Sequence, residues 1–151
     1  MMRRLVRLPP WINLGLLAFF LISTQWTKLN AQCIPEEYSR DCIQKIHDGF
    51  IYLKSYNIDD MNGPVKEVEY SAVFSKDTKY DLLICSRSSQ NGSIKLTVYN
   101  AKREVMATLD TGPEGSAEIE FNCDQTGIYY LTFTSQGQGG SCGGCVLSFK
   151  K

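Results

Sequence analysis

Apolar and polar residues alternate along most of the sequence after residue 50, and this period of two predicts β-strands. Segment 65–74 shows the pattern most clearly, with Val68, Tyr70 and Phe74 on one face of the predicted strand. Such segments follow one another at near-regular spacing, separated by turn clusters: 50–57, 65–74, 80–86, 93–99, 104–109, 117–123, 128–135 and 145–150. No helical pattern lies between them, so we expect an all-β fold, an antiparallel, jelly-roll-like β-sandwich of about eight strands.

A short helix is expected before the first strand, over about 35–47. Pro35 suits the first turn of a helix, and the two glutamates that follow it suit the positive N-terminal end. Apolar residues recur at helical spacing up to residue 46, and the turn Asp48-Gly49 then ends the helix. We therefore expect a single β-sandwich domain over 32–151, with a short N-terminal helix and strands from about residue 50.

Residues 1–31 have the three zones of a secretory signal peptide. Three arginines form a basic start, segment 11–23 is apolar, and the polar stretch after it ends at Ala31, where we place the cleavage. The apolar run is shorter than the roughly 20 residues that a spanning helix needs, so a retained anchor is the disfavoured alternative. Gln32 stands in front of Cys33, where a lipoprotein signal would need a small residue. We expect a periplasmic, cell-surface or extracellular protein that meets the membrane only transiently, during export.

Removal of the signal changes the charge of the domain. The signal contains four of the 16 basic residues and none of the 16 acidic ones, so the formal charge of 32–151 is −4. A mildly acidic domain has no electrostatic reason to bind nucleic acid, and that class of partner is excluded. Both tryptophans, Trp11 and Trp26, also lie in the signal.

All the cysteines lie in the predicted domain, and in an oxidising compartment an even number indicates a disulfide framework. The candidates are Cys33, Cys42, Cys85, Cys123, Cys142 and Cys145. Sequence proximity favours a bond between Cys33 and Cys42. Two further cysteines end predicted strands, which suggests a cross-strand bond between Cys85 and Cys123. By elimination, Cys142 would pair with Cys145.

The motif Cys142-Gly143-Gly144-Cys145 also has a redox interpretation. A redox pair needs a thiol of low pKa, usually at the N-terminal end of a helix. The segment that follows, 146–149, has the composition of a strand. A structural disulfide that holds a glycine-rich loop, or two cysteines bonded elsewhere, is therefore the favoured interpretation.

The sequence offers no convincing catalytic, cofactor or metal site. His47 is the only histidine and lies beside a turn, where we expect a surface or helix-end residue. The acidic residues Glu118 and Glu120 occupy the polar face of a strand, as solvated charges do. The adjacent Tyr129 and Tyr130 point to opposite faces of a strand, so we expect one of them to face outward as a possible ligand platform.

From residue 65 onward the strand order resembles the jelly-roll modules known as bacterial pre-peptidase C-terminal domains. The resemblance is carried by EYSAVFSKDTKYDLLIC, IKLTVYNAKREVMATL, IEFNCDQTGIYYLTFTS and CVLSFK, with the step TGIYYLTF as its most recognisable piece. It implies an accessory binding or folding module, not a catalytic one. Some of those modules hold calcium beside the strand that corresponds to 94–99, but here Asn91, Asn100 and Lys102 flank it, so no metal site is carried over. The chain from residue 32 is also similar to small, uncharacterised secreted proteins of Bacteroidetes-type bacteria.

These observations favour a secreted, non-enzymatic binding or interaction module for a protein or a glycan, at the cell surface or in the extracellular space. One alternative is a structural envelope or matrix component without a discrete ligand. A second alternative, from another class, is a thiol-disulfide oxidoreductase that uses Cys142 and Cys145.

Overall fold

Eight strands and one α-helix account for most of the chain that the computed structural model describes, which is residues 33–59, 67–86, 92–137 and 141–151. The predicted signal peptide and its cleavage position lie outside these residues. The elements are α2 (Pro35–Ile43), β1 (Ile51–Ile58), β2 (Glu67–Phe74), β3 (Thr78–Ser86), β4 (Gly92–Tyr99), β5 (Val105–Asp110), the 3-10 helix η1 (Gly112–Glu114), β6 (Ser116–Cys123), β7 (Gly127–Gly137) and β8 (Gly143–Lys150). Within the described ranges, no helix is both long and apolar enough to cross a membrane.

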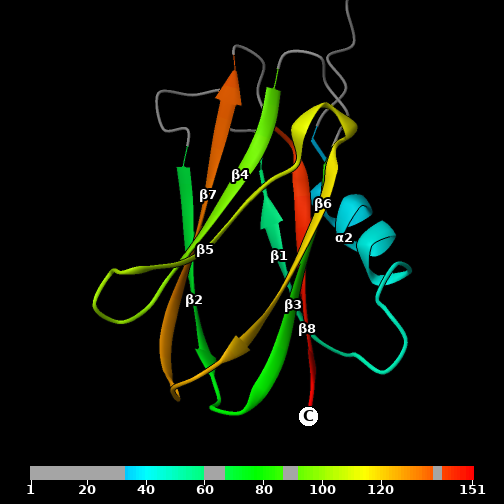
Figure 1. Ribbon diagram of the computed structural model, residues 1–151. Coiled ribbons are helices and arrows are strands. Elements are labelled where there is room, and N and C mark those ends of the chain that lie inside the picture. Colours follow the sequence, from blue (N-terminus) through cyan, green and yellow to red (C-terminus); the bar gives the residue numbers. More distant parts are fainter. Residues whose placement is uncertain (1–32, 60–66, 87–91, 138–140) are drawn as a thin grey trace, which may run out of the picture. The chain divides into compact units, whose positions relative to one another are not determined.

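The strands form two four-stranded antiparallel sheets, which face each other in Figure 1. Sheet A has the strand order β1-β8-β3-β6, and sheet B has the order β2-β7-β4-β5. The chain changes sheet at every connection except the one between β4 and β5, so strands that are consecutive in sequence are rarely neighbours. This is the double Greek key of a jelly roll. The predicted antiparallel β-sandwich of about eight strands is confirmed.

The core lies between the two sheets and is formed by the inward faces of alternating strands. Leu82 of β3, Leu96 of β4 and Phe133 of β7 are completely buried there. An aromatic group closes one end of the core, where the rings of Phe74 and Tyr80 stack with their centres 4.3 Å apart. Burial of these faces is the main force that fixes the register of the strands, because a slip of one residue would turn every apolar side chain outward.

Helix α2 covers the outer face of sheet A, over β3 and β8 (Figure 1). A second, smaller apolar cluster lies beneath it and contains Cys42, Leu83, Cys85 and Val146. Strand β3 is therefore buried on both faces over most of its length. This cover explains why residues 80–86 are more apolar than a strand with one solvated face.

The helix is shorter than the 35–47 predicted, since it ends at Ile43. The backbone N–H of Lys45 donates to the carbonyl of Cys42, three residues back, which tightens the last turn. The segment 44–50 then runs as a loop toward β1, and the N–H of Phe50 donates to the carbonyl of His47. The early end of the helix places His47 on a loop, from which it contacts β6.

Candidate functional site

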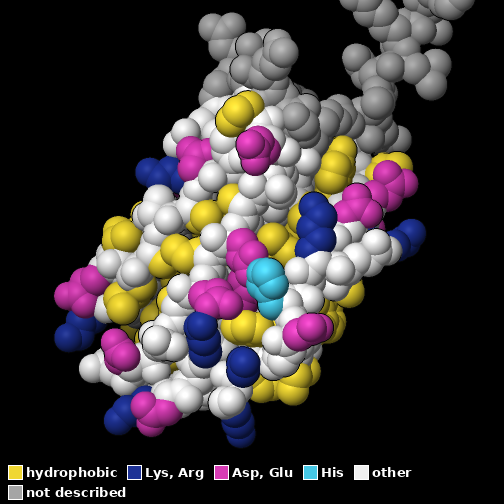
Figure 2. Space-filling view, turned by 45° about the vertical axis from the view of Figure 1, so that its right-hand side comes forward, with side chains coloured by type: hydrophobic (Ala, Val, Ile, Leu, Met, Phe, Trp, Pro, Cys, Tyr) yellow, Lys and Arg dark blue, Asp and Glu magenta, His cyan; other side chains and the backbone are white. Residues whose placement is uncertain are grey.

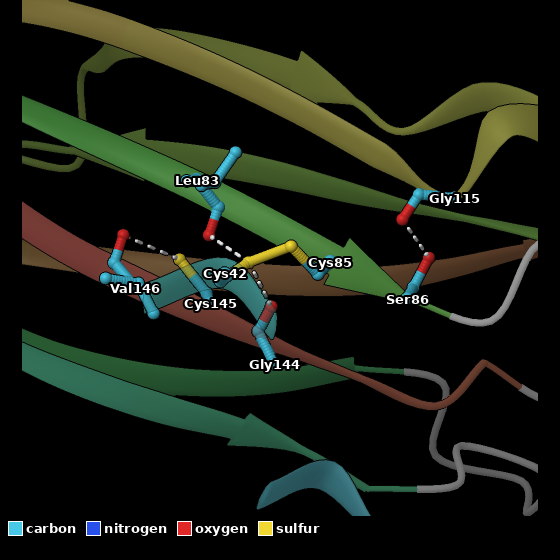
Figure 3. The surroundings of a disulfide bond; sticks show 8 residues. All are labelled: Cys42, Leu83, Cys85, Ser86, Gly115, Gly144, Cys145 and Val146. Atoms are coloured by element: carbon cyan, nitrogen blue, oxygen red, sulfur yellow. Dashed lines mark hydrogen bonds between the residues drawn. A yellow bond between two sulfur atoms is a disulfide. The ribbon is translucent and has the colours of Figure 1, made fainter. Parts of the chain in front are cut away.

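The disulfides differ from the pairs predicted from sequence. Cys42 of α2 is bonded to Cys85 of β3, as Figure 3 shows, and Cys33 is bonded to Cys142. The sulfur of Cys42 also lies 3.4 Å from the carbonyl oxygen of Leu83. The first bond fastens the helix to sheet A, and the second fastens the start of the described domain to the segment that leads into β8. Both support an oxidising compartment, where such bonds persist.

The predicted bond between Cys85 and Cys123 is wrong. Each cysteine lies at the C-terminal end of its strand, and the two strands run in opposite directions. β3 and β6 are antiparallel, and the register pairs Thr78 with Cys123 and Cys85 with Ser116, so the two sulfurs lie at opposite ends of the pair. They also lie on opposite faces of sheet A, since Cys123 belongs to the core and Cys85 to the cluster beneath α2.

The other two predicted bonds are wrong for related reasons. Cys33 precedes α2 and Cys42 lies in its last turn, so most of the helix separates the two residues. Cys142 precedes β8, whereas Cys145 is fully buried in the core between the sheets. Cys123 and Cys145 are free, buried thiols.

The motif Cys142-Gly143-Gly144-Cys145 is a structural element of this fold. Cys142 is bonded to Cys33, and burial raises the pKa of the Cys145 thiol, which is the opposite of what a redox nucleophile needs. Gly144 packs against the helix so closely that a Cβ atom there would lie 2.6 Å from the backbone nitrogen of Ser39. A Cβ at Gly143 would lie 2.7 Å from the carbonyl oxygen of Cys85. Of the two interpretations favoured from the sequence, a Cys142–Cys145 disulfide is wrong, and Cys142 is bonded elsewhere.

The two tyrosines proposed as a ligand platform do face opposite sides of β7, and neither presents a bare ring. Tyr129 is only 5% exposed and belongs to the core, where its hydroxyl donates to the carbonyl of Gln125 at 3.0 Å. Burial is the main cause that raises its pKa to about 12. Tyr130 is half-buried, and the guanidinium of Arg103 lies over its ring, 3.8 Å from the ring centre. The one outward tyrosine is thus already stacked by a side chain of the protein itself.

Arg103 reaches this position from a tightly built turn between β4 and β5. Asn100 organises the turn, because its side-chain oxygen accepts hydrogen bonds from the backbone N–H groups of Lys102 and Glu104, both at 2.9 Å. The guanidinium then donates twice to Glu69 of β2, at 2.6 and 3.1 Å, and this pairing lowers the pKa of Glu69. The turn is thereby joined across the outer face of β7 to β2 at the far side of sheet B.

An apolar surface lies at the same end of sheet B. It comprises four side chains that are exposed by 46 to 66%, and we refer to it as the sheet B patch: Val73, Val105, Met106 and Ile128. Val73 and Ile128 are cross-strand partners. Met106 and Ile128 line a cavity of about 340 Å³ between the turn after β4 and the turn before β7. Polar residues line the same cavity: Asn100, Lys102, Glu104, Asp124, Gln125 and Thr126. Concave sites with apolar floors and polar rims are typical of binding surfaces.

A second polar site lies on the outer face of sheet A, beyond the end of α2. We call it the carboxyl-histidine cluster: His47, Asp81 and Glu118. The ring nitrogen Nε2 of His47 lies 2.8 and 2.9 Å from the two carboxylate oxygens of Glu118. Figure 2 shows the histidine against a group of acidic side chains, with cationic side chains beside them. The hydrogen bond to Glu118 is the main cause that raises the pKa of His47.

Asp81 is the unexpected member of this cluster. It lies within the apolar segment of β3, is 1% exposed, and accepts a hydrogen bond from the Ser148 hydroxyl at 3.1 Å. Burial, followed by the charge of Glu118, raises its pKa to about 6. Glu120, which pairs with Asp81 across the strands, forms an ion pair with Lys79. Sequence reasoning missed Asp81, although a lone aspartate inside an apolar strand is a recognisable signal.

Metal ligation has no support in the part of the chain that the structure describes. No group of three or more His, Cys, Asp or Glu side chains there is arranged to hold a metal ion.

Comparison with known proteins gives a likeness of fold. No family model and no curated protein matches the chain. Among solved structures, it is similar to the pre-peptidase C-terminal domain of collagenase from Bacillus anthracis, with 15% identity and a TM-score of 0.49 over 64% of this chain and 88% of that one. It is also similar to a structure of infectious bursal disease virus, Gx strain, with 14% identity and a TM-score of 0.32 over 68% of this chain and 30% of that one. At these identities the likeness concerns the fold, and no role is carried over.

Proposed function

We propose that this protein is a secreted, non-enzymatic binding module that contacts a protein partner through the sheet B patch. The observation that carries the proposal is that two exposed apolar side chains, Met106 and Ile128, line the cavity of about 340 Å³. Exposed apolar side chains that gather around a concavity with a polar rim are a recurrent feature of interaction surfaces. The two disulfides support an extracytoplasmic location for such a module.

The chemistry of the patch favours a protein over a glycan. Sugars bind to sandwich domains largely by stacking on exposed aromatic rings. The outward ring of Tyr130 is covered by Arg103, and the uncovered side chains at this end are aliphatic or Met. Met106 and Ile128 suit an apolar side chain of a protein, while the polar residues that line the cavity can satisfy the backbone groups on either side of it.

The same surface also bears on the alternative, a structural matrix component without a discrete ligand. A purely structural component would need no apolar recess, because its exposed face could be uniformly polar. Val73 and Ile128 pair across β2 and β7 with 66% and 48% of their surfaces exposed, and such exposed apolar pairs lower solubility unless a partner covers them. A bound partner would give this arrangement a purpose.

A random-peptide display selection on the purified, immobilised protein tests the proposal. We expect the selected peptides to carry an apolar anchor residue. Their affinity should fall at least tenfold when Ile128→Glu places a charge on the lining of the cavity. The matched control is Ile51→Glu, because Ile51 is 61% exposed on β1 in the other sheet. Affinity would be measured by surface plasmon resonance, with a glycan array run in parallel.

Two results would count against this function. One is a set of peptides whose affinity is unchanged by Ile128→Glu or is equally reduced by Ile51→Glu. The other is specific glycan retention that Ile128→Glu abolishes, which would assign the same surface to a different class of ligand.

A further inference from the structure

The buried carboxyl group of Asp81 has an unmet hydrogen-bonding requirement. Its oxygen Oδ2 accepts from Ser148, whereas Oδ1 is buried and has no donor among the described residues. A buried carboxylate oxygen without a donor is costly, because the charged group has lost its water and gained nothing in return. A proton on Oδ1 removes this cost, since the neutral acid becomes a donor itself.

The acceptor for that proton lies on the neighbouring strand. Glu118 of β6 pairs across the strands with Leu83, two positions from Asp81 of β3, so Glu118 and Asp81 are diagonal neighbours on the outer face of sheet A. The charge of Glu118 and hydrogen bonding to it both raise the pKa of Asp81. On its other side, the Glu118 carboxylate is held by His47 of the loop 44–50. Glu118 therefore has Asp81 as its diagonal neighbour on the adjacent strand and His47 as its ion-pair partner.

We propose that the carboxyl-histidine cluster is an acid-responsive fastening: Asp81 and Glu118 share one proton, and below neutral pH this shared proton together with a protonated His47 holds the loop 44–50 onto sheet A. The site is independent of the binding function proposed for the opposite sheet. Because the loop follows directly after α2, the fastening acts together with the Cys42–Cys85 bond in holding the helical cover on β3 and β8.

The direction of the pH dependence follows from two shifts. The pKa of Asp81 is raised above its ordinary value, so the folded state gains stability as the pH falls through about 6. The pKa of His47 is also raised, so its contribution is complete below its ordinary pKa of 6.5 and is lost as the pH rises through the higher value of the folded state. Both groups favour the folded state at pH 5 over pH 8.

The other charged groups around Asp81 do not reverse this direction. On β6, Glu120 adds to the rise in the pKa of Asp81, although it is also paired with Lys79 of β3. On β8, Ser148 opposes the rise by its hydrogen bond, and the ammonium of Lys150 lies 6.0 Å from the ring centre of Phe50. Helix α2 packs on this face through Tyr38 and Cys42. Its charged groups Glu36, Glu37, Arg40 and Asp41 are not among the causes that shift the pKa of Asp81.

The test is thermal unfolding of the protein as the cell produces it, with the variant Asp81→Asn, at pH 5.0 and pH 8.0. The asparagine amide can donate to Glu118 at every pH and so imitates the protonated aspartic acid. We expect Asp81→Asn to raise Tm by about 4 °C at pH 8.0, as for a gain of one well-formed buried hydrogen bond, and to leave it nearly unchanged at pH 5.0. Asp124→Asn, at an exposed turn, is the matched control and should change Tm equally at both pH values.

A second readout reports on the loop itself. The amide of Phe50 donates to the carbonyl of His47, so its hydrogen-exchange protection factor follows the fastening of the loop. We expect this factor to be larger at pH 5.0 than at pH 8.0, and the difference to disappear in His47→Gln. A lower Tm for Asp81→Asn at pH 8.0 would show that Asp81 is needed as a charged acceptor and would overturn the proposal. A Phe50 protection factor that is independent of pH in the unaltered protein would also overturn it.

Discussion

Replacing both members of the buried disulfide, as Cys42→Ala/Cys85→Ala, is expected to lower the free energy of unfolding by about 4 kcal/mol. The bond closes a loop of 43 residues, and the chain-entropy model assigns about that value to a loop of this length. It also holds α2 over Leu83 and Val146, so its loss exposes the apolar cluster beneath the helix. Since domains of this size are stable by only about 5–15 kcal/mol, we expect a large fall in Tm. Urea unfolding followed by circular dichroism measures the change.

The free thiols supply the control for this prediction. Cys123→Ala also removes a buried sulfur but leaves both disulfides in place, so it should cost only the packing of one small side chain, about 1 kcal/mol. A reductant should strongly destabilise both the unaltered protein and the Cys123→Ala variant, because each of them keeps both disulfides. It should destabilise Cys42→Ala/Cys85→Ala less, because only the Cys33–Cys142 bond is left to reduce. Equal losses for the two variants would contradict the role given to the buried bond.

The second large effect is expected at Gly144, where Gly144→Ala should destabilise the protein by about 3 kcal/mol. The new methyl group would overlap the side chain and the backbone of Ser39, with its carbon 2.6 Å from the Ser39 nitrogen. Backbone cannot move aside as the end of a flexible side chain can, so the helix must shift away from β8. Calorimetric Tm and the far-ultraviolet helix signal would both report the change.

Two variants make the interpretation of Gly144→Ala specific. Gly127→Ala adds the same methyl group on β7, where nothing lies within 4 Å, so it should be neutral or slightly stabilising. Adding Ser39→Gly to Gly144→Ala removes the side-chain overlap but leaves the backbone contact, so we expect partial recovery. Full recovery, or no loss in Gly144→Ala alone, would show that the helix is not in close contact with β8.

The fold could be read from the sequence because the alternation of residues is a local property with a direct structural meaning. Strand β2 illustrates this, since its alternate residues Val68, Tyr70, Ala72 and Phe74 all pack toward the core as predicted. The two-sheet architecture was accessible for a related reason. Many short strands with no helices between them favour a closed double sheet, which needs connections between the sheets. Such patterns can be recognised in the sequence without knowledge of any long-range contact.

The cysteine pairing could not be predicted from the sequence. It depends on the relative direction of the strands and on the face of the sheet that each cysteine occupies, and the alternation of residues reveals neither. Cys85 and Cys123 both end strands, but the antiparallel register separates them. Cys42 and Cys85 lie 43 positions apart in sequence and meet only because α2 folds back on the outer face of β3. No local signal states where a short helix will pack.

The candidate sites were only partly predictable, for physical reasons of the same kind. One of Tyr129 and Tyr130 was expected to face outward, and it is Tyr130. The stacking of Arg103 on its ring depends on the conformation of the turn built by Asn100, which the sequence does not reveal. Arg103 itself adopts a positive φ of 64°, which a sequence-based argument would assign to glycine or asparagine first. His47 was expected at the surface, where it lies, but its partner Glu118 is 71 residues away.

Two disulfides fasten the helix and the glycine-rich segment to the β-sandwich. Mass-spectrometric disulfide mapping of the exported protein, without reduction and with alkylation of free thiols after denaturation, tests the claim most directly. The two thiols at Cys123 and Cys145 should be alkylated, because both are free and buried in the folded protein.

We expect this mapping to find two cross-linked peptides, one joining Cys33 to Cys142 and one joining Cys42 to Cys85. A peptide that joins Cys142 to Cys145 would contradict this pairing, because these two cysteines would then form the adjacent pair that a redox enzyme needs.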